Sequence, residues 1–314
     1  MPKIAKVAFF FTVIAGFALA RGQAVPPDAN VPAVAASSAP AAADERPQVI
    51  LNVLVDLKKG VTAPIPVSSL EIFEDGAQQK IESIAGPGSP VSLCLMIDIS
   101  GSMTKYKDQI GEVAKELVRS LPQGSEVMVS TFAEKTHLVL PFTPATEVDL
   151  SNFGHEQQGL RTAMNDAIVI TEPYFVSLAR YPRRALVLIS DGGDNASRHH
   201  TSDAIRSMEM PSSPFVYVLG ISDPYAPTPE ERMSVAKLDS FSSAGALIAK
   251  LSDVRDLLRA ATEISECIDR QYALSYRSAL TTPDKRLHKI QVKLPALDSN
   301  IRIESLPGYY IQSH

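Results

Sequence analysis

The sequence predicts an α/β fold: a doubly wound, mostly parallel sheet with helices on both faces, inserted in a small β module made from the N- and C-terminal flanks. From Val91 onward, short apolar runs alternate with segments of helical periodicity, which is typical of a parallel-dominated sheet covered by helices. In the flanks, 47–86 and 270–314, apolar and polar residues alternate as half-buried strands require. The flanks therefore predict strands, and the middle predicts alternating strands and helices.

Length and charge limit the possible functions. The chain has 314 residues, of which 45% are hydrophobic, enough for one large domain and a smaller one. The formal net charge is −5, and loss of the two lysines in residues 1–20 would make it more negative. This acidic balance does not favour a nucleic-acid partner.

The first 20 residues have the pattern of a signal peptide. Lys3 and Lys6 precede an apolar stretch that ends in Ala18-Leu19-Ala20, which has the small-x-small form of a signal-peptidase site. We expect cleavage after Ala20, with Ala24 as the second choice. A stretch of about 14 apolar residues is short for a membrane span. The chain is therefore expected to be exported, to the periplasm or outside the cell, with no membrane span after cleavage.

A linker is predicted between the signal peptide and the folded part. Residues 21–46 are rich in Ala and Pro and lack hydrophobic periodicity. The N-terminal half of the β module is expected at 47–86, where Asp75-Gly76 is a hairpin signal. The C-terminal half is expected at 270–314, with strands at 271–277, 288–294 and 300–304.

The middle of the chain, 90–268, is expected to form the large α/β domain. Its predicted strands end in polar residues at two places: the run Val91–Ile97 is followed by Asp98, and the run 185–189 is followed by Ser190 and Asp191. The carboxyl ends of neighbouring strands line the crevice where open α/β sheets bind ligands. Other predicted elements are an antiparallel edge pair at 127–132 and 138–142, helices at 110–121, 162–180 (interrupted near Pro173), 229–241 and 254–268, and strands at 215–221 and 246–249.

Oxygen-bearing side chains follow the first of these strands at alternate positions. Asp98, Ser100 and Ser102 offer a carboxylate and two hydroxyls, and Gly101 allows a tight turn before a helix. Such ligands suit a hard cation, Mg²⁺ before Mn²⁺ or Ca²⁺. A simpler interpretation of these residues alone is a helix cap made by Ser102.

The wider pattern resembles the metal-ion-dependent adhesion site of a von Willebrand factor type A (VWFA) domain, with a Rossmann-like sheet, over about 90–268. The resemblance rests on Asp98-Ile99-Ser100-Gly101-Ser102, then Thr162, then Asp191. It implies a metal site in which Ser100, Ser102 and Thr162 are direct or switchable ligands and both aspartates often act through water. It also implies that the metal captures an Asp or Glu of a partner protein, and that the last helix of the domain shifts as a switch.

The flanks resemble those of a bacterial secreted VWFA-related subfamily. The matching residues are Glu74-Asp75-Gly76, Gln271-Tyr272-Ala273-Leu274-Ser275-Tyr276 and Pro307-Gly308-Tyr309. We therefore expect an exported, non-enzymatic binding protein. The alternative is a structural or assembly component of the cell envelope whose metal is mainly structural.

A serine hydrolase is a weaker alternative. Ser102-Met103-Thr104-Lys105 fits a Ser-x-x-Lys pattern, but the sequence has no Lys-Thr-Gly or Ser-Asp-Asn partner for it.

His199 and His200 follow Asp191 and are expected in a solvated loop rather than as ligands, because imidazole favours softer metals. Cys94 and Cys267 either pair in an oxidising compartment or remain buried free thiols.

Overall fold

The computed structural model describes residues 46–57, 67–150, 159–221, 228–251, 256–295 and 301–311. These residues belong to one compact unit, Glu45–His314. The expected signal peptide at 1–20 lies outside the described residues, and so does the expected linker at 21–46 except for Arg46. Both stay predictions, as do the exact domain boundaries. No helix within the described ranges is long and apolar enough to cross a membrane.

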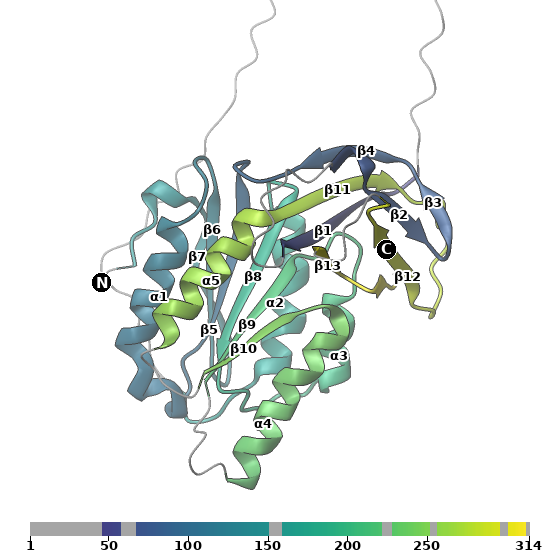
Figure 1. Ribbon diagram of the computed structural model, residues 1–314. Helices are drawn as coiled ribbons and strands as arrows, with labels where there is room; N and C mark the ends of the chain where they lie inside the picture. The colour runs from purple at the N-terminus through teal and green to yellow at the C-terminus, as the bar shows by residue number, and fades with distance from the viewer. Residues whose placement is uncertain are drawn as a thin grey trace, which may run out of the picture. The chain divides into compact units, whose positions relative to one another are not determined.

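A six-stranded sheet forms the centre of the unit (Figure 1). Its order is β10-β9-β8-β5-β6-β7, and all neighbours are parallel except β6 and β7, which are antiparallel at one edge. The strands are β5 (Val91–Asp98), β6 (Glu126–Phe132), β7 (Thr136–Pro144), β8 (Arg183–Ser190), β9 (Phe215–Ile221) and β10 (Leu247–Leu251). Strands β5, β6, β8 and β9 are buried at every position, which explains their near-continuous apolar sequences. The predicted parallel-dominated sheet with an antiparallel edge pair is confirmed.

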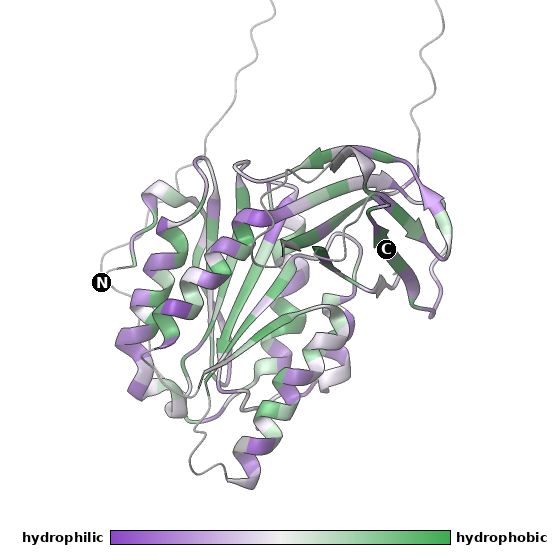
Figure 2. Cartoon of the chain, viewed as in Figure 1, coloured by the Kyte–Doolittle hydropathy of each residue, from purple (hydrophilic) through white to green (hydrophobic). Residues whose placement is uncertain are grey.

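Helices cover both faces of this sheet. One face packs against α1 (Lys107–Arg119) and α5 (Leu257–Arg270), and the other against α2 (Met164–Leu178), α3 (Thr201–Met208) and α4 (Pro229–Ser240). Alternate residues of β5 enter the two cores: Leu93 and Leu95 face α1 and α5, whereas Cys94 and Met96 face α2. Figure 2 shows the central strands as mainly hydrophobic and many hydrophilic residues on the outer helices. The doubly wound arrangement is therefore as predicted.

The flanks of the chain form two further four-stranded sheets, with orders β13-β1-β11-β4 and β14-β12-β2-β3. Each sheet combines strands from both flanks, so the two ends of the chain build one β module with its own apolar core. The first sheet contains β1 (Gln48–Leu57), β4 (Ile81–Ala85), β11 (Gln271–Arg277) and β13 (Ile301–Ser305). The second contains β2 (Glu71–Glu74), β3 (Ala77–Gln79), β12 (His288–Lys293) and β14 (Gly308–Tyr309).

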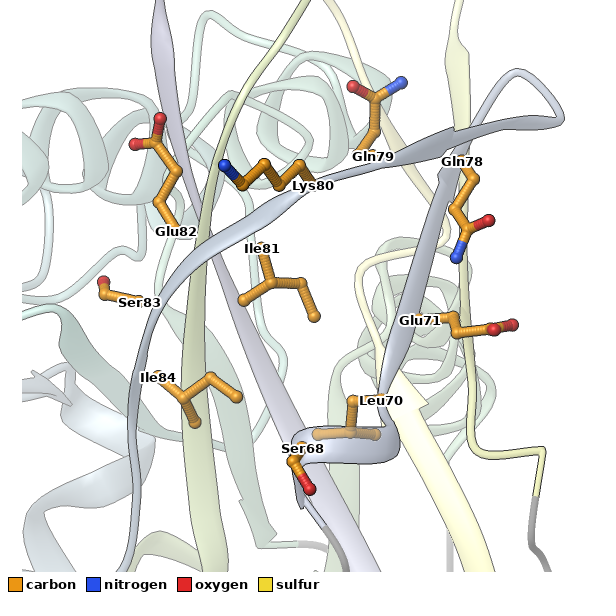
Figure 3. Close-up of a pocket in the computed structure, with 10 residues that line it drawn as sticks. All are labelled: Ser68, Leu70, Glu71, Gln78, Gln79, Lys80, Ile81, Glu82, Ser83 and Ile84. Atoms are coloured by element: carbon orange, nitrogen blue, oxygen red, sulfur yellow. The ribbon is translucent and has the colours of Figure 1, made fainter.

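The chain passes from an edge of one flank sheet to an edge of the other at Lys80, between β3 and β4. A shallow surface pocket lies in this corner, bordered by the β2–β3 hairpin and by β4 (Figure 3). Ile81 and Ile84 line its β4 side, and Leu70 and Gln78 line its hairpin side. This pocket is lined by residues of the β module and includes none of the predicted metal ligands.

Buried polar residues join the β module to the central sheet. The fully buried guanidinium of Arg183 donates hydrogen bonds to the carbonyl oxygens of Ser89, Ile268, Asp269 and Gln271. It therefore binds the end of α5, the start of β11 and the segment before β5 at once. Asn52 adds a second link, because its Oδ1 accepts hydrogen bonds from the backbone N–H of Arg184 at 3.0 Å and from Nε2 of Gln271 at 2.7 Å.

Two features differ from the sequence-based expectation. Helix α2 continues through Pro173 without interruption, because Pro173 lies on the exposed face, where water can satisfy the carbonyl that loses its donor. The short helix α3 was not predicted; it begins after His200, where Asp203 accepts a hydrogen bond from the His200 backbone N–H at 2.8 Å.

No disulfide joins Cys94 and Cys267, so of the two alternatives left open by the sequence the one without a disulfide is found. Cys94 lies in the middle of β5, between Met128 and Leu186 on the neighbouring strands, and faces the core under α2. Cys267 packs against the core on the opposite face of the sheet. The sheet itself separates the two side chains.

Candidate metal centre

Asp98 and Asp191 lie at the carboxyl ends of two adjacent parallel strands. Asp98 is the last residue of β5, Asp191 directly follows β8, and β5 and β8 pair from Val91 to Ile97. The chain leaves β5 toward β6 and β7 on one side and returns to β8 on the other side, so this is the point where the strand order reverses. Open α/β sheets bind ligands at that point. The fold thus brings both predicted carboxylates to one crevice.

The loop after β5 places the backbone N–H and the hydroxyl of Ser100 beside the Asp98 carboxylate. The backbone N–H of Ser100 donates to Oδ1 of Asp98 at 2.9 Å, and the hydroxyl oxygens of Ser100 and Ser102 lie 3.2 Å apart. Ser100 is buried, whereas Ser102 is exposed at the start of a 3-10 helix, Gly101–Tyr106. No side-chain capping hydrogen bond is found at the start of that helix. The turn therefore leaves one hydroxyl inside the crevice and one at its mouth.

Thr162 reaches the same crevice from the segment before α2. This segment is held beside the β5 loop by a parallel bridge between Ser100 and Gly159, and by a hydrogen bond of 2.7 Å from the Ala163 N–H to the Ala133 carbonyl. A Cβ atom on Gly193 would lie 3.0 Å from Oδ1 of Asp191 and 3.7 Å from Oγ1 of Thr162. These two side-chain oxygens thus face the same small space, which a larger residue at Gly193 would fill.

The electrostatics of the crevice reflect two close, partly desolvated acids. Burial, and then the nearby negative charge of Asp191, raise the pKa of Asp98 to about 7, although hydrogen bonds from Ser100 and Ser190 act in the opposite direction. A divalent cation between the carboxylates would remove this repulsion and favour the ionised form.

The five predicted side chains fit a hard cation by their chemistry. Two carboxylates match the charge of a divalent ion, and three hydroxyls add neutral oxygen ligands, so the set lacks the nitrogen and sulfur that zinc prefers. The residues brought together are Asp98, Ser100, Ser102, Thr162 and Asp191. Their role as metal ligands remains a prediction.

Several residues that support these side chains were not singled out from the sequence. Ser190 donates from Oγ to Oδ2 of Asp98 at 2.8 Å. Asn195 makes two hydrogen bonds with the backbone of Thr162. Its Oδ1 accepts one from the Thr162 N–H at 3.0 Å, and its own backbone N–H donates one to the Thr162 carbonyl at 2.9 Å. Asp194 accepts from the Asn165 N–H at 3.3 Å, and Nζ of Lys237 lies 3.9 Å from its Oδ2. In the sequence, the only indication of these supporting residues is a cluster of short polar residues at the end of a predicted buried strand.

The histidines near the site have other partners. Nδ1 of His199 lies 2.8 Å from Oδ1 of Asp166, which also accepts from the His199 N–H at 2.8 Å and the Arg198 N–H at 2.9 Å. Burial acts to raise the pKa of Asp166, but these hydrogen bonds outweigh it and lower that pKa. Both histidines are exposed, and His200 directly precedes α3. The exposed histidine loop that the sequence predicts is therefore found.

One contact of Lys105 bears on the serine hydrolase alternative. Nζ of Lys105 lies over the ring of the neighbouring Tyr106, 4.8 Å from its centroid. The ammonium group is thus engaged with an aromatic face next to it in the chain. Absence of enzymatic activity stays an expectation.

The family profile described as von Willebrand factor type A domain matches residues 93–193. Domains of this family commonly mediate protein–protein interactions. The match runs from near the start of β5 into the loop after β8, and it includes all five predicted site residues. No curated protein sequence matches the chain.

Solved structures with similarity to this chain come from several organisms. A von Willebrand factor type A protein from Catenulispora acidiphila is 13% identical, with 85% of this chain and 75% of that chain covered and a TM-score of 0.48. The conserved hypothetical protein BatB from Bacteroides thetaiotaomicron is 19% identical, with 56% and 98% covered and a TM-score of 0.41. The ArnB paralog VWA2 from Sulfolobus acidocaldarius is 16% identical, with 81% and 74% covered and a TM-score of 0.44.

Proposed function

We propose that this protein, which carries a von Willebrand factor type A domain, is an exported binding module that captures an acidic residue of a partner protein through Mg²⁺. Asp98, Ser100, Ser102, Thr162 and Asp191 would hold the ion. The observation that carries the proposal is the convergence of these oxygen-bearing side chains at the point of the sheet where the strand order reverses. Mn²⁺ and Ca²⁺ suit the same donors.

Each part of the site has a separate task in this mechanism. Asp98 and Asp191 supply the negative charge that retains a divalent cation, and Ser190 and the Ser100 N–H fix the Asp98 carboxylate by hydrogen bonds. Thr162 is held in place by Asn195. The bound ion supplies positive charge for a partner carboxylate. Ser102 is exposed, so the partner would approach from the side of Ser102.

The rim around the crevice favours an anionic partner group. Lys105, Arg161 and Arg198 are exposed and adjoin the three loops that carry the site residues. Their charges attract an acidic partner before contact and act against a cationic one. The net charge of the whole chain is negative, so this attraction is local to the rim.

Export follows from the predicted signal peptide at 1–20, and the compartment is proposed as the periplasm or the extracellular space. We further propose that the protein is not an enzyme. The flanking β module, which resembles that of bacterial secreted relatives, would serve as a platform for the binding domain rather than as a second site.

A second candidate function is a structural component of the cell envelope in which the metal mainly stabilises the loops. The observation that favours it is the repulsion between Asp98 and Asp191, because a cation that relieves it stabilises the fold even with no partner present. The two functions differ in whether the metal is needed for binding or only for stability.

A capture experiment separates them. The immobilised protein is exposed to envelope extract of its source organism in Mg²⁺ or in EDTA, beside Asp191→Asn and the control Asp108→Asn, whose side chain is exposed on α1. The proposal predicts partners that bind wild type and the control in Mg²⁺, elute with EDTA and are absent from Asp191→Asn. Partners retained equally in EDTA by all three proteins would support the structural role.

A further inference from the structure

The segment before Thr162 holds one leucine outward beside the metal crevice. Leu160 is 90% exposed, although the backbone on both sides of it is anchored. Gly159 forms a parallel bridge with the loop after β5, and the Arg161 guanidinium donates a hydrogen bond to the Asn195 carbonyl. Leu160 is therefore kept at the surface by a fixed segment, two residues before a predicted metal ligand.

A second strongly exposed apolar side chain flanks the loop after β8 from α4. In that loop, Oδ2 of Asp194 lies 3.9 Å from Nζ of Lys237. Met233 precedes Lys237 by four residues, so it lies on the same side of α4, one turn nearer the N-terminus, and it is 72% exposed. Because α4 follows β9, its first turns lie at the carboxyl edge of the sheet, where the metal crevice opens. Figure 1 shows α4 extending past the ends of the central strands.

Leu160 and Met233 have the two largest exposed fractions among the large apolar side chains in the described part of the chain. Single exposed apolar residues are ordinary on protein surfaces. The position of these two is not, because they flank the Asp191 loop from two different elements, next to the exposed basic residues Arg161 and Arg198. The crevice thus combines oxygen ligands at its centre with apolar and cationic side chains on its rim. This combination fits a ligand whose acidic group is surrounded by apolar ones.

We propose that the partner presents its acidic residue with a large apolar residue one or two positions away, and that Leu160 and Met233 bind such neighbours. The inference rests on the proposed function, since the metal ion is what positions the acidic residue. The Cα atoms of Leu160 and Thr162 lie within about 7 Å of each other, because two residues span no more than that. An extended peptide advances about 3.3 Å per residue, so a neighbour of the captured residue reaches Leu160. Met233, with its flexible thioether, receives neighbours on the other side.

The apolar contacts supply a selectivity that the metal contact lacks. Every Asp or Glu offers the same carboxylate, so the ion by itself distinguishes only acidic residues from others. Burial of an apolar neighbour against Leu160 adds affinity in proportion to the apolar area removed from water. The same contact excludes water from the rim, which strengthens the attraction between the carboxylate and the ion. A polar neighbour gains neither effect.

Selection from a phage-displayed library of random peptides tests the inference without a known partner. The immobilised protein is incubated with the library in Mg²⁺, and bound phage are eluted with EDTA. Wild type should enrich Asp or Glu with a large apolar residue within two positions. The double variant Leu160→Ser/Met233→Ser should still enrich the acidic residue but lose the apolar preference. The matched control is Leu258→Ser on α5, where the native leucine is 49% exposed, and it should select like wild type.

Fluorescence polarisation with one selected peptide measures the size of the effect. Replacing the apolar neighbour by Ser in the peptide, or Leu160 by Ser in the protein, should each weaken binding at least about tenfold. Isothermal titration of Leu160→Ser with Mg²⁺ should match wild type, because Leu160 is not a proposed ligand, and circular dichroism shows that the variant is folded.

The outcomes separate this inference from the proposed function. Acidic residues enriched without an apolar neighbour would overturn the inference and leave metal-dependent capture standing. So would an apolar preference that the double variant Leu160→Ser/Met233→Ser retains in full. If no peptide binds in Mg²⁺ and elutes with EDTA, or if the eluted peptides lack acidic residues, both the inference and the proposed function are overturned.

Discussion

The hydroxyl of Ser190 donates a hydrogen bond of 2.8 Å to Oδ2 of Asp98 and accepts one of 2.9 Å from the backbone N–H of Gly192. Ser190 is the last residue of β8, and Asp98 is the last residue of β5. One buried side chain thus connects the two strands that carry the carboxylates of the proposed site. It also fixes the turn in which Asp191 lies.

Substitution Ser190→Ala should therefore weaken metal binding without removing any proposed ligand. Loss of an outer hydrogen bond to a ligating carboxylate typically lowers metal affinity by about tenfold or more. Isothermal titration with Mg²⁺ measures the change, and Ser177→Ala on the exposed side of α2 is the control. Equal affinity of Ser190→Ala and wild type would show that Asp98 needs no such support.

The raised pKa of Asp98 predicts a pH-dependent loss of stability in the metal-free protein. The pKa is about 7 in the folded state and near 3.8 in the unfolded chain, so between these values the folded state binds a proton that the unfolded state has released. Stability from this group is therefore present below about pH 4 and is lost as pH rises through about 7. The variant Asp98→Asn should not lose stability in this way, because an asparagine side chain does not titrate in this pH range.

Urea unfolding in EDTA at a series of pH values measures the effect. The free energy of unfolding of Asp98→Asn minus that of wild type should grow by a few kcal/mol from about pH 4 to about pH 8. Glu172, whose pKa burial also raises to about 7, is present in both proteins and cancels in the difference. A difference independent of pH would mean that Asp98 is not protonated in the folded apo protein.

Gly192 should tolerate no side chain. Its φ is +80°, and a Cβ atom there would lie 2.4 Å from the Ser234 carbonyl oxygen of α4. Gly76 has a similar φ of +86° but no atom within 4 Å of its Cβ position, so Gly76→Ala is a control for backbone strain alone. We expect Gly76→Ala to cost about 1 kcal/mol and Gly192→Ala at least about 2 kcal/mol more, by urea unfolding. Similar costs would mean that α4 moves freely away from the loop.

Arg183 should be essential for the connection between α5 and the β module. Arg183→Ala removes one donor from each of the carbonyls of Ser89, Ile268, Asp269 and Gln271 and leaves a cavity in place of a fully buried side chain, which should cost at least about 3 kcal/mol of unfolding free energy. Arg180→Ala, at a side chain that is 72% exposed, should cost less than about 1 kcal/mol. If the costs were equal, the buried network would not stabilise the fold. The same contacts restrain the end of the last helix, whose shift the family resemblance implies.

The sequence predicted the fold where pattern and burial agree. The apolar run before Asp98 became a fully buried strand, and Asp75-Gly76 became a tight turn between β2 and β3. The prediction failed where local preference and tertiary context differ. Pro173 suggested a break in α2, but its exposed position allows the helix to continue, and α3 is too short for periodicity to reveal.

The candidate site, like the fold, could be predicted only in part from the sequence. Its five oxygen-bearing residues form a motif in the sequence, whereas Ser190 and Asn195 act through hydrogen bonds that only the folded chain creates. The position of Cys94 also required the structure, because the register of β5 decides which face of the sheet it enters. Patterns in the sequence identify candidate ligands, but the residues that orient them depend on contacts far apart in the chain.

The most direct test of the central claim is isothermal titration of the metal-free protein with Mg²⁺, comparing wild type, Asp98→Asn and the surface control Asp108→Asn. The account predicts saturable binding at one site for wild type and the control, and at least about a hundredfold weaker binding for Asp98→Asn, because a ligating charge is lost. No saturable binding by wild type at millimolar Mg²⁺, or equal binding by wild type and Asp98→Asn, would contradict it.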